Sequence, residues 1–201
     1  MRRHLVSAAI GWIAAACSVL MASGAGAADV TSNLLWWPQA TPLIEANSFE
    51  ARFGAFAHGV GGKEKGSADI NAELLFPRLP LFGLPPELAV FVPRPQVGVM
   101  INTAGKTSYV YGGAVWTVNI TPRFFLEPMF GGVVHNGQTE ATDPDRVSLG
   151  CHVMFHTGLS AGFRIDEHWT LLATWDHISN AGSCSRNVGL NDYGLKLGYR
   201  F

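Results

Sequence analysis

The sequence predicts an all-β protein, an eight-stranded antiparallel transmembrane β-barrel of the outer-membrane type. The 201-residue chain is 48% hydrophobic and only 14% charged, which is too apolar for an ordinary soluble surface. After residue 27 no run of about 18 uninterrupted apolar residues occurs, so helical membrane spans are not expected. Segments of about ten residues instead alternate apolar and polar side chains, as barrel strands do.

The first 27 residues are predicted to be a secretory signal peptide. Two arginines precede an apolar stretch that ends near Ala22, and Ala25-Gly26-Ala27 then offers a small-residue cleavage site. An uncleaved anchor is the alternative, and the short apolar stretch and the cleavage site argue against it. Residues 28–47 are expected to be irregular, and residues 48–201 to form the barrel. Export followed by barrel formation predicts a bacterial outer-membrane location.

Eight alternating segments are separated by turn signals. The expected strands are approximately 49–58, 69–76, 96–102, 109–120, 124–135, 151–165, 169–179 and 191–201. One face of these segments is apolar, and the other carries polar and charged residues: Glu50, Arg52, Asn71, Glu73, Glu127, Arg164, Asp176, Lys196 and Arg200. Such charges can pair inside a small barrel while the apolar face meets lipid. An even strand number then places the loops after the odd-numbered strands outside the cell.

The charge balance limits the partners of the chain. The formal net charge is −1, and removal of the two signal-peptide arginines makes it more negative. Without an excess of basic residues, the chain is not expected to bind nucleic acid. The expected partner is the membrane itself, and the sequence leaves open whether two copies form a homodimer.

The residues with catalytic chemistry gather in the last two predicted strands. His177 and Ser179 are two residues apart, so their side chains point to the same face of a strand. That face is the apolar one, and Asn191 lies on the apolar face of the next strand. A serine activated by a histidine attacks acyl carbonyls, so the pattern predicts ester hydrolysis on an outer-leaflet lipid. The alternative is a set of interfacial polar residues without a catalytic role.

A longer motif surrounds this pair. His-x-Ser-Asn at His177, Ser179 and Asn180 is followed by Asn-x-Gly at Asn187 and Gly189, and then by the Gly-Tyr-Arg-Phe end. Residues 175–201 thereby resemble the lipid A 3-O-deacylase (PagL-type, acyloxyacyl hydrolase-like) family of outer-membrane barrels. The resemblance implies an eight-stranded barrel without a cofactor that removes the 3-O-linked acyl chain of lipid A, so that lipopolysaccharide is its partner. It also implies that His177 is the general base, Ser179 the nucleophile, and Asn180 and Asn187 contributors to the oxyanion hole.

One catalytic position departs from the family. The triad acid of the family is a glutamate, and the aligned residue here is Asn191, which carries no charge to stabilise an imidazolium. Replacing the triad acid by its amide costs about 10⁴ in a serine protease, yet papain-like enzymes orient their histidine with an asparagine. Weak or altered hydrolase activity is therefore expected. The alternative function is a non-catalytic, degenerate barrel with a structural or lipid-binding role.

Two other residue pairs carry possible chemistry. Cys151 and Cys184 remain after signal cleavage, and export to an oxidising compartment allows them to form a disulfide. Two free thiols are the alternative. His152 and His156 have the spacing of a metal pair on a helix, but on a strand they are about 13 Å apart. No metal site is therefore predicted.

Overall fold

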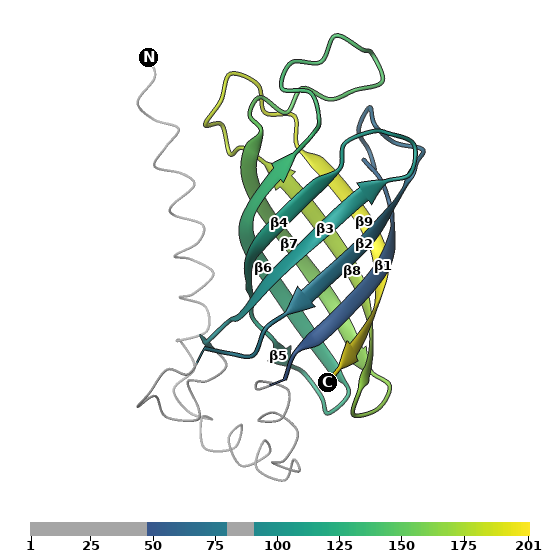
Figure 1. Cartoon of the computed structure of the whole chain (residues 1–201), viewed down its shortest axis with the longest axis vertical. Helices are drawn as coiled ribbons and strands as arrows, with labels where there is room; N and C mark the ends of the chain where they lie inside the picture. The colour runs from purple at the N-terminus through teal and green to yellow at the C-terminus, as the bar shows by residue number, and fades with distance from the viewer. Residues whose placement is uncertain (1–47, 80–90) are drawn as a thin grey trace, which may run out of the picture. The chain divides into compact units, whose positions relative to one another are not determined.

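The computed structural model describes residues 48–79 and 91–201, which form a closed antiparallel β-barrel (Figure 1). The predicted signal peptide and irregular segment lie outside the described residues. Within the described ranges, no helix is long and apolar enough to cross a membrane. The strands are β1 (Glu50–Ala57), β2 (Ala68–Leu75), β3 (Arg94–Asn102), β4 (Tyr109–Val115), β5 (Val118–Asn119), β6 (Phe124–His135), β7 (Val153–Arg164), β8 (Trp169–Ser179) and β9 (Leu190–Arg200).

The sheet closes through antiparallel pairing of β1 with β9 and of β4 with β6. The short β5 continues β4 along the same partner β6, so β4 and β5 together count as one strand of an eight-stranded barrel. The sequence predicted this strand as the unbroken segment 109–120. Its ladder lapses opposite Pro128, which has no N–H to donate. The predicted fold class is confirmed.

Alternation sorts the side chains onto two faces of the barrel. Along β8, outward residues are exposed or half-buried and every inward residue is buried. Large apolar side chains are exposed around the outside: Phe53, Ile70, Val97, Ile101, Val110, Phe130, Val134, Leu159 and Leu195. Soluble monomers rarely expose so much contiguous apolar surface. A lipid environment explains this outer face.

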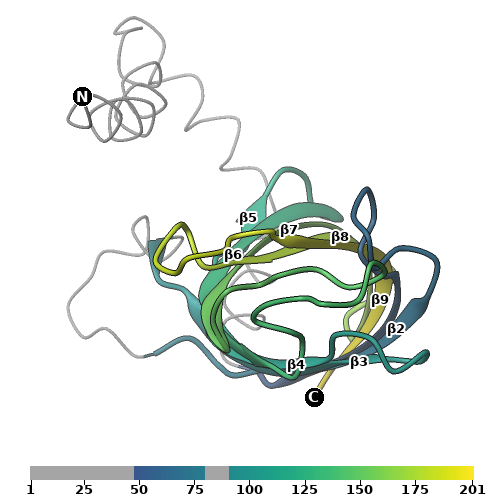
Figure 2. The ribbon, with the colours of Figure 1, turned by 90° about the horizontal axis from the view of Figure 1, so that it is seen from above.

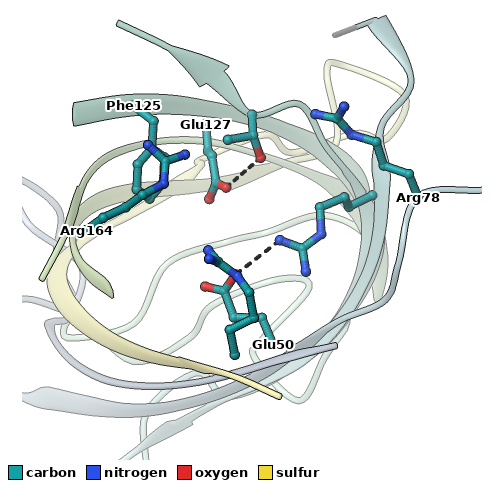
Figure 3. A pocket seen from close by; sticks show the side chains of 8 residues that line it. Glu50, Arg78, Phe125, Glu127 and Arg164 are labelled. Carbon is teal, nitrogen blue, oxygen red and sulfur yellow. Dashed lines mark hydrogen bonds and ion pairs between the residues drawn. The ribbon is translucent and has the colours of Figure 1, made fainter. Parts of the chain in front are cut away.

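The predicted charges point inward and pair with one another. Arg52 bonds Glu50 at 2.7 Å and Glu127 at 2.7 Å, and Lys196 bonds Glu73 at 2.9 Å. Figure 3 shows the cavity beside Glu50 and Glu127, whose volume is only about 10 Å³. A space of that size holds about one water molecule. This part of the lumen is therefore filled by side chains, which argues against a pore.

The inward face is less polar than its charges predict. At one end of the barrel, which we call the loop end, lie the long loops 58–67, 103–108, 136–152 and 180–189. An apolar cluster fills the lumen there: Phe56, Met100, Tyr109, Tyr111, Val133, Val147, Leu149, Met154, Ile178 and Leu190. Val147 and Leu149 belong to the loop between β6 and β7, which crosses the mouth of the barrel (Figure 2). The cluster anchors this loop beside the ends of β8 and β9.

Candidate functional site

The end of the β8–β9 hairpin brings three predicted residues to the outer face of the barrel. His177 pairs directly with Asn191 across the two strands, and Ser179 follows on the same face. All three are half-buried. The His177 Nδ1 atom lies 2.9 Å from Asn191 Oδ1. The hairpin therefore joins the histidine to the asparagine that the sequence analysis aligns with the family acid.

Trp175, which the sequence did not single out, is a fourth member of this arrangement. Its indole N–H donates to Asn191 Oδ1 at 3.1 Å. An indole nitrogen can only donate, so the oxygen end of the asparagine amide has to face Trp175. The same oxygen lies against His177, whose Nδ1 must then carry a proton. In the neutral imidazole Nε2 is consequently the acceptor, which is the tautomer that a general base requires.

Space for the imidazole depends on Gly189. A Cβ atom at this position would lie 2.6 Å from His177 Cε1 and 3.1 Å from Nε2. Within the described ranges, neither His177 Nε2 nor Ser179 Oγ has a hydrogen-bond partner. Catalytic hydrogen bonds are often long before substrate binds. The base and the nucleophile thus share one face, and both polar atoms are available to a ligand.

Asn180 and Asn187 differ in what their side chains are free to do. The Asn180 Nδ2 group donates to the carbonyls of Leu149 and Arg186, so both of its hydrogens are used within the protein. The Asn180 backbone N–H donates to Asn187 Oδ1 at 3.0 Å. Because this bond holds the oxygen end of the exposed Asn187, its Nδ2 group is the end left for a ligand. The contacts make Asn180 an anchor and Asn187 the available donor.

The loop between β8 and β9 is tied to the neighbouring loop at two points. Cys151 and Cys184 form a disulfide with a Cα–Cα separation of 6.1 Å. The Val188 N–H also donates to Ser148 O at 3.2 Å. Both bonds join the loop that carries Asn187 to the segment that precedes β7. They restrict the motion of the residues beside Ser179.

Comparison with known proteins gives a family match to the part of the chain that contains this hairpin. The family model described as "Lipid A 3-O-deacylase (PagL)" matches residues 94–200, from β3 to the end of β9. The chain belongs to the PagL family. This family comprises lipid A 3-O-deacylases, which are ester hydrolases, and the outer-membrane barrel fold places the chain in the bacterial outer membrane.

Solved structures give the same fold. The crystal structure of the outer membrane enzyme PagL is similar with a TM-score of 0.57 and 14% identity, over 75% of this chain and 98% of that one. The N-terminal β-barrel domain of Pseudomonas aeruginosa OprF has a TM-score of 0.50 and 12% identity, over 77% and 98% of the two chains. At these identities the likeness concerns the fold alone. A comparison with curated protein sequences found no match.

A shallow apolar groove runs along the outer face of this PagL-family barrel, next to Trp175. It has a volume of about 320 Å³ and is lined by Leu159, Ala161, Ala173, Thr174, Trp175, Tyr193 and Gly194. Ala161 and Ala173 face each other across β7 and β8, and Leu159 faces Trp175 two residues nearer the loop end. Small side chains thus form the floor and larger ones the walls. An extended hydrocarbon chain fits such a groove.

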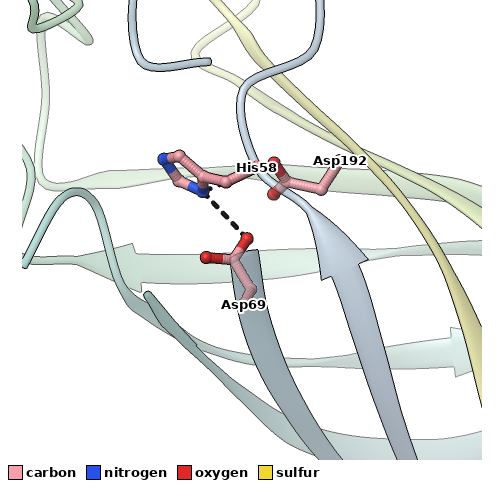
Figure 4. Close-up of side chains that lie close together, drawn as sticks. All are labelled: His58, Asp69 and Asp192. Atoms are coloured by element: carbon pink, nitrogen blue, oxygen red, sulfur yellow. Dashed lines mark hydrogen bonds and ion pairs between the residues drawn. The ribbon is translucent and has the colours of Figure 1, made fainter. Parts of the chain in front are cut away.

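On the opposite face of β9, the PagL-family barrel holds a second histidine that sequence reasoning missed (Figure 4). His58 Nδ1 lies 2.8 Å from Asp69 Oδ2 and 3.5 Å from Asp192 Oδ1, and Nε2 lies 3.1 Å from Glu64 Oε2. Asp192 also accepts from the Gly59 N–H and the Tyr109 hydroxyl. We call His58, Glu64, Asp69 and Asp192 the inner cluster.

The inner cluster has metal-ligand chemistry, and its groups are also paired with one another. One ligand atom each of His58, Asp69 and Asp192 lies within 4.8 Å of the others. Burial alone would lower the pKa of His58, but its bonds to Asp69 and Glu64 raise that pKa to about 9. The cluster is therefore better explained as a structural ion-pair network, and Glu64 in its Lys-Glu-Lys loop carried no sequence signal for it.

Proposed function

We propose that this chain is a lipid A deacylase that removes an ester-linked acyl chain by a serine–histidine mechanism at the outer leaflet. The observation that carries the proposal is the bonded series Trp175, Asn191 and His177, which leaves His177 Nε2 free to act as a base. Membership of the family supports lipid A as the substrate class and the 3-O position as the bond that is cut.

The chemistry divides into two steps. Ser179 Oγ attacks the acyl carbonyl carbon while His177 Nε2 accepts the hydroxyl proton. As the bond to the sugar oxygen breaks, that oxygen takes the proton from His177 and leaves as a hydroxyl. Water, deprotonated by His177, then attacks the acyl-serine ester. The products are a free fatty acid, the deacylated lipid and the regenerated serine.

Two asparagines support the charge that develops on the carbonyl oxygen. The Asn187 Nδ2 group donates to this oxyanion, since its own oxygen is already held by the Asn180 N–H. Asn180 acts indirectly by orienting Asn187 and by anchoring the loop to Leu149. This division refines the sequence-based hypothesis, which gave both side chains the same role.

The apolar groove next to Trp175 explains why the reaction takes place on the membrane face. The acyl chain lies along Ala161 and Ala173 and stays in the hydrocarbon layer, while its ester reaches Ser179 near the loop end. The chain therefore need not leave the bilayer for its ester to be cut. Moving the chain into water instead would cost about 0.8 kcal/mol per methylene.

A second candidate function is favoured by Asn191 itself. An amide cannot offset the positive charge of an imidazolium, so a barrel with this residue could bind lipid A without cutting it. The two candidates differ in one observable property, which is the acylation pattern of lipid A in cells that make the protein.

Mass spectrometry of lipid A from expressing cells tests the proposal. We expect loss of one ester-linked acyl chain with the wild type, and the complete acylation pattern with Ser179→Ala or His177→Asn. Ser183→Ala, in the same loop and exposed, is the matched control and should behave as wild type. An unchanged pattern in wild type would reject deacylation. Acyl loss that persists in Ser179→Ala would reject the mechanism.

A further inference from the structure

A basic groove lies at the loop end, beside the proposed catalytic hairpin. Its volume is about 590 Å³, and it is lined by Gly61, Gly62, Lys63, Lys65, Pro144, Asp145, Arg146, Val147, Ser148 and Val188. Three of these residues are basic and one is acidic, although the whole chain has a formal net charge of −1. The groove therefore carries a local excess of positive charge.

The turn that carries Lys63 and Lys65 is anchored by the buried carboxylate of Glu64. Because Glu64 points inward and is fully buried, its neighbours Lys63 and Lys65 are turned outward and are exposed. Lys106 Nζ donates to the backbone carbonyls of Glu64 and Lys65, at 2.8 Å each, which fixes the turn. The two lysines thus extend from a rigid support.

Arg146 is positioned by the same carboxylate from the opposite wall. Its Nε donates to Glu64 Oε1 at 3.1 Å, and its Nη1 donates to Gly105 O at 3.4 Å. Its Nη2 group makes no bond within the described residues. Arg146 therefore presents two N–H donors beside the lysine turn, in an orientation set before any ligand arrives.

The groove borders the catalytic hairpin on two sides. The Val60 N–H, one residue before the groove begins, donates to Asn191 O at 2.8 Å. Val188, which lines the groove, lies between Asn187 and Gly189 in sequence and donates to Ser148 O. A ligand group in the groove is therefore adjacent to the residues proposed to orient and stabilise the reaction.

We propose that this groove binds a phosphate monoester on the sugar headgroup of the lipid whose acyl chain occupies the outer apolar groove. The inference rests on the proposed substrate class and adds the group that the loops recognise. Lysine and arginine N–H groups are the usual ligands of phosphate oxygens in proteins. The polar loop end and the apolar outer face then bind the two ends of one amphipathic molecule, and the ester between them meets Ser179.

Binding to vesicles separates this inference from catalysis. The full mature chain carrying Ser179→Ala, in detergent, is titrated with phosphatidylcholine vesicles that contain lipid A, or the same lipid A after phosphatase treatment. We expect tighter binding to the phosphorylated form. The pair Lys63→Gln and Lys65→Gln should reduce that preference roughly thirtyfold, given the usual contribution of each of two cations at an anionic lipid surface. The pair Lys63→Arg and Lys65→Arg should retain it.

Three results would overturn the inference: no preference in the parent, a full preference in the glutamine pair, or equal competition by inorganic phosphate alone. Arg123→Gln removes an exposed charge from the opposite end of the barrel and should retain the preference. Heat-dependent gel mobility establishes that each variant is folded. If the wild type cuts no lipid while the preference persists, the proposed function fails and the groove assignment stands.

Discussion

Two histidines contact opposite faces of β9 through the adjacent residues Asn191 and Asp192. Asp192 points inward to His58, with Asp69 and Glu64 around the same imidazole. Asn191 points outward to His177. Inside, both ring nitrogens of the histidine face carboxylates, and the imidazole is charged. Outside, one nitrogen faces a neutral amide and the other has no partner among the described residues.

The contrast separates structural from catalytic use of the same side chain. A histidine with two carboxylate partners stabilises what surrounds it but has no nitrogen left to accept a proton. A histidine with a single oriented partner keeps one nitrogen available as a base. The proposal that His177 is the reactive histidine therefore rests on the number of its partners, rather than on burial or the presence of an acid. Four changes test this comparison.

The largest effect is expected from Gly189→Ala, which removes the space beside the outer imidazole. The new methyl group would lie 2.6 Å from His177 Cε1, so the ring must move away from its position. A misplacement of that order lowers kcat by about 10². The measurement is deacylation of lipid A by purified protein. Gly132→Ala is the control, since its nearest neighbour outside the flanking residues is Met154 O at 3.9 Å; equal activity of both variants would contradict the assignment.

Asn191→Asp gives His177 a carboxylate partner, of the kind that His58 already has in Asp69. The aspartate keeps the side-chain length, so its oxygen can still accept from Trp175 and His177. In a serine protease the acid-to-amide change costs about 10⁴, because the histidine adopts the wrong tautomer. Here Trp175 prevents the wrong tautomer, and we expect a smaller gain in kcat of roughly tenfold. A fall in kcat would show that Asn191 is not in the position of the triad acid.

Trp175→Phe removes the donor that distinguishes the two ends of the Asn191 amide. Without it the amide can turn its nitrogen toward His177, and we expect kcat to fall about tenfold while KM stays near wild type. A carboxylate has two equivalent oxygens, so the same change in the Asn191→Asp background should have little effect. The double-mutant cycle thus separates orientation from simple packing of the indole. Equal losses in both backgrounds would assign Trp175 a packing role only.

The faces of the barrel could be predicted from the sequence because alternation with a period of two places charges and apolar residues independently of neighbouring strands. The break between β4 and β5 could not be predicted from alternation, since its cause is Pro128 on the partner strand β6. Trp175 has no distinguishing sequence signal, because the register pairs it with Tyr193 and its bond to Asn191 runs diagonally between the strands. The anchoring of Asn180 depends on the carbonyls of Leu149 and Arg186, whose positions follow from loop folding.

The smallest expected effect on catalysis, and the clearest on stability, comes from titrating the inner cluster at His58 and Glu64, in the loop between β1 and β2. The pKa of His58 is raised to about 9, so its stabilisation is complete below pH 6.5 and is lost as the pH rises through about 9. The bonds that Glu64 accepts from His58, Val147 and Thr107 outweigh its burial and lower its pKa to about 2. The stabilisation from Glu64 is therefore complete above pH 4.5 and is lost as the pH falls from 4.5 to about 2.

Unfolding midpoints measured by heat-dependent gel mobility should thus decline on both sides of the interval between pH 4.5 and 6.5. The alkaline decline reflects the loss of the positive charge on His58. His58→Gln should have a lower midpoint throughout and should lose most of the decline between pH 6.5 and 9. His177→Gln is the matched control on the outer face and should keep the wild-type profile. The single bonded partner of His177 is the neutral amide of Asn191. If the alkaline decline vanished in His177→Gln and not in His58→Gln, the roles assigned to the two histidines would be reversed.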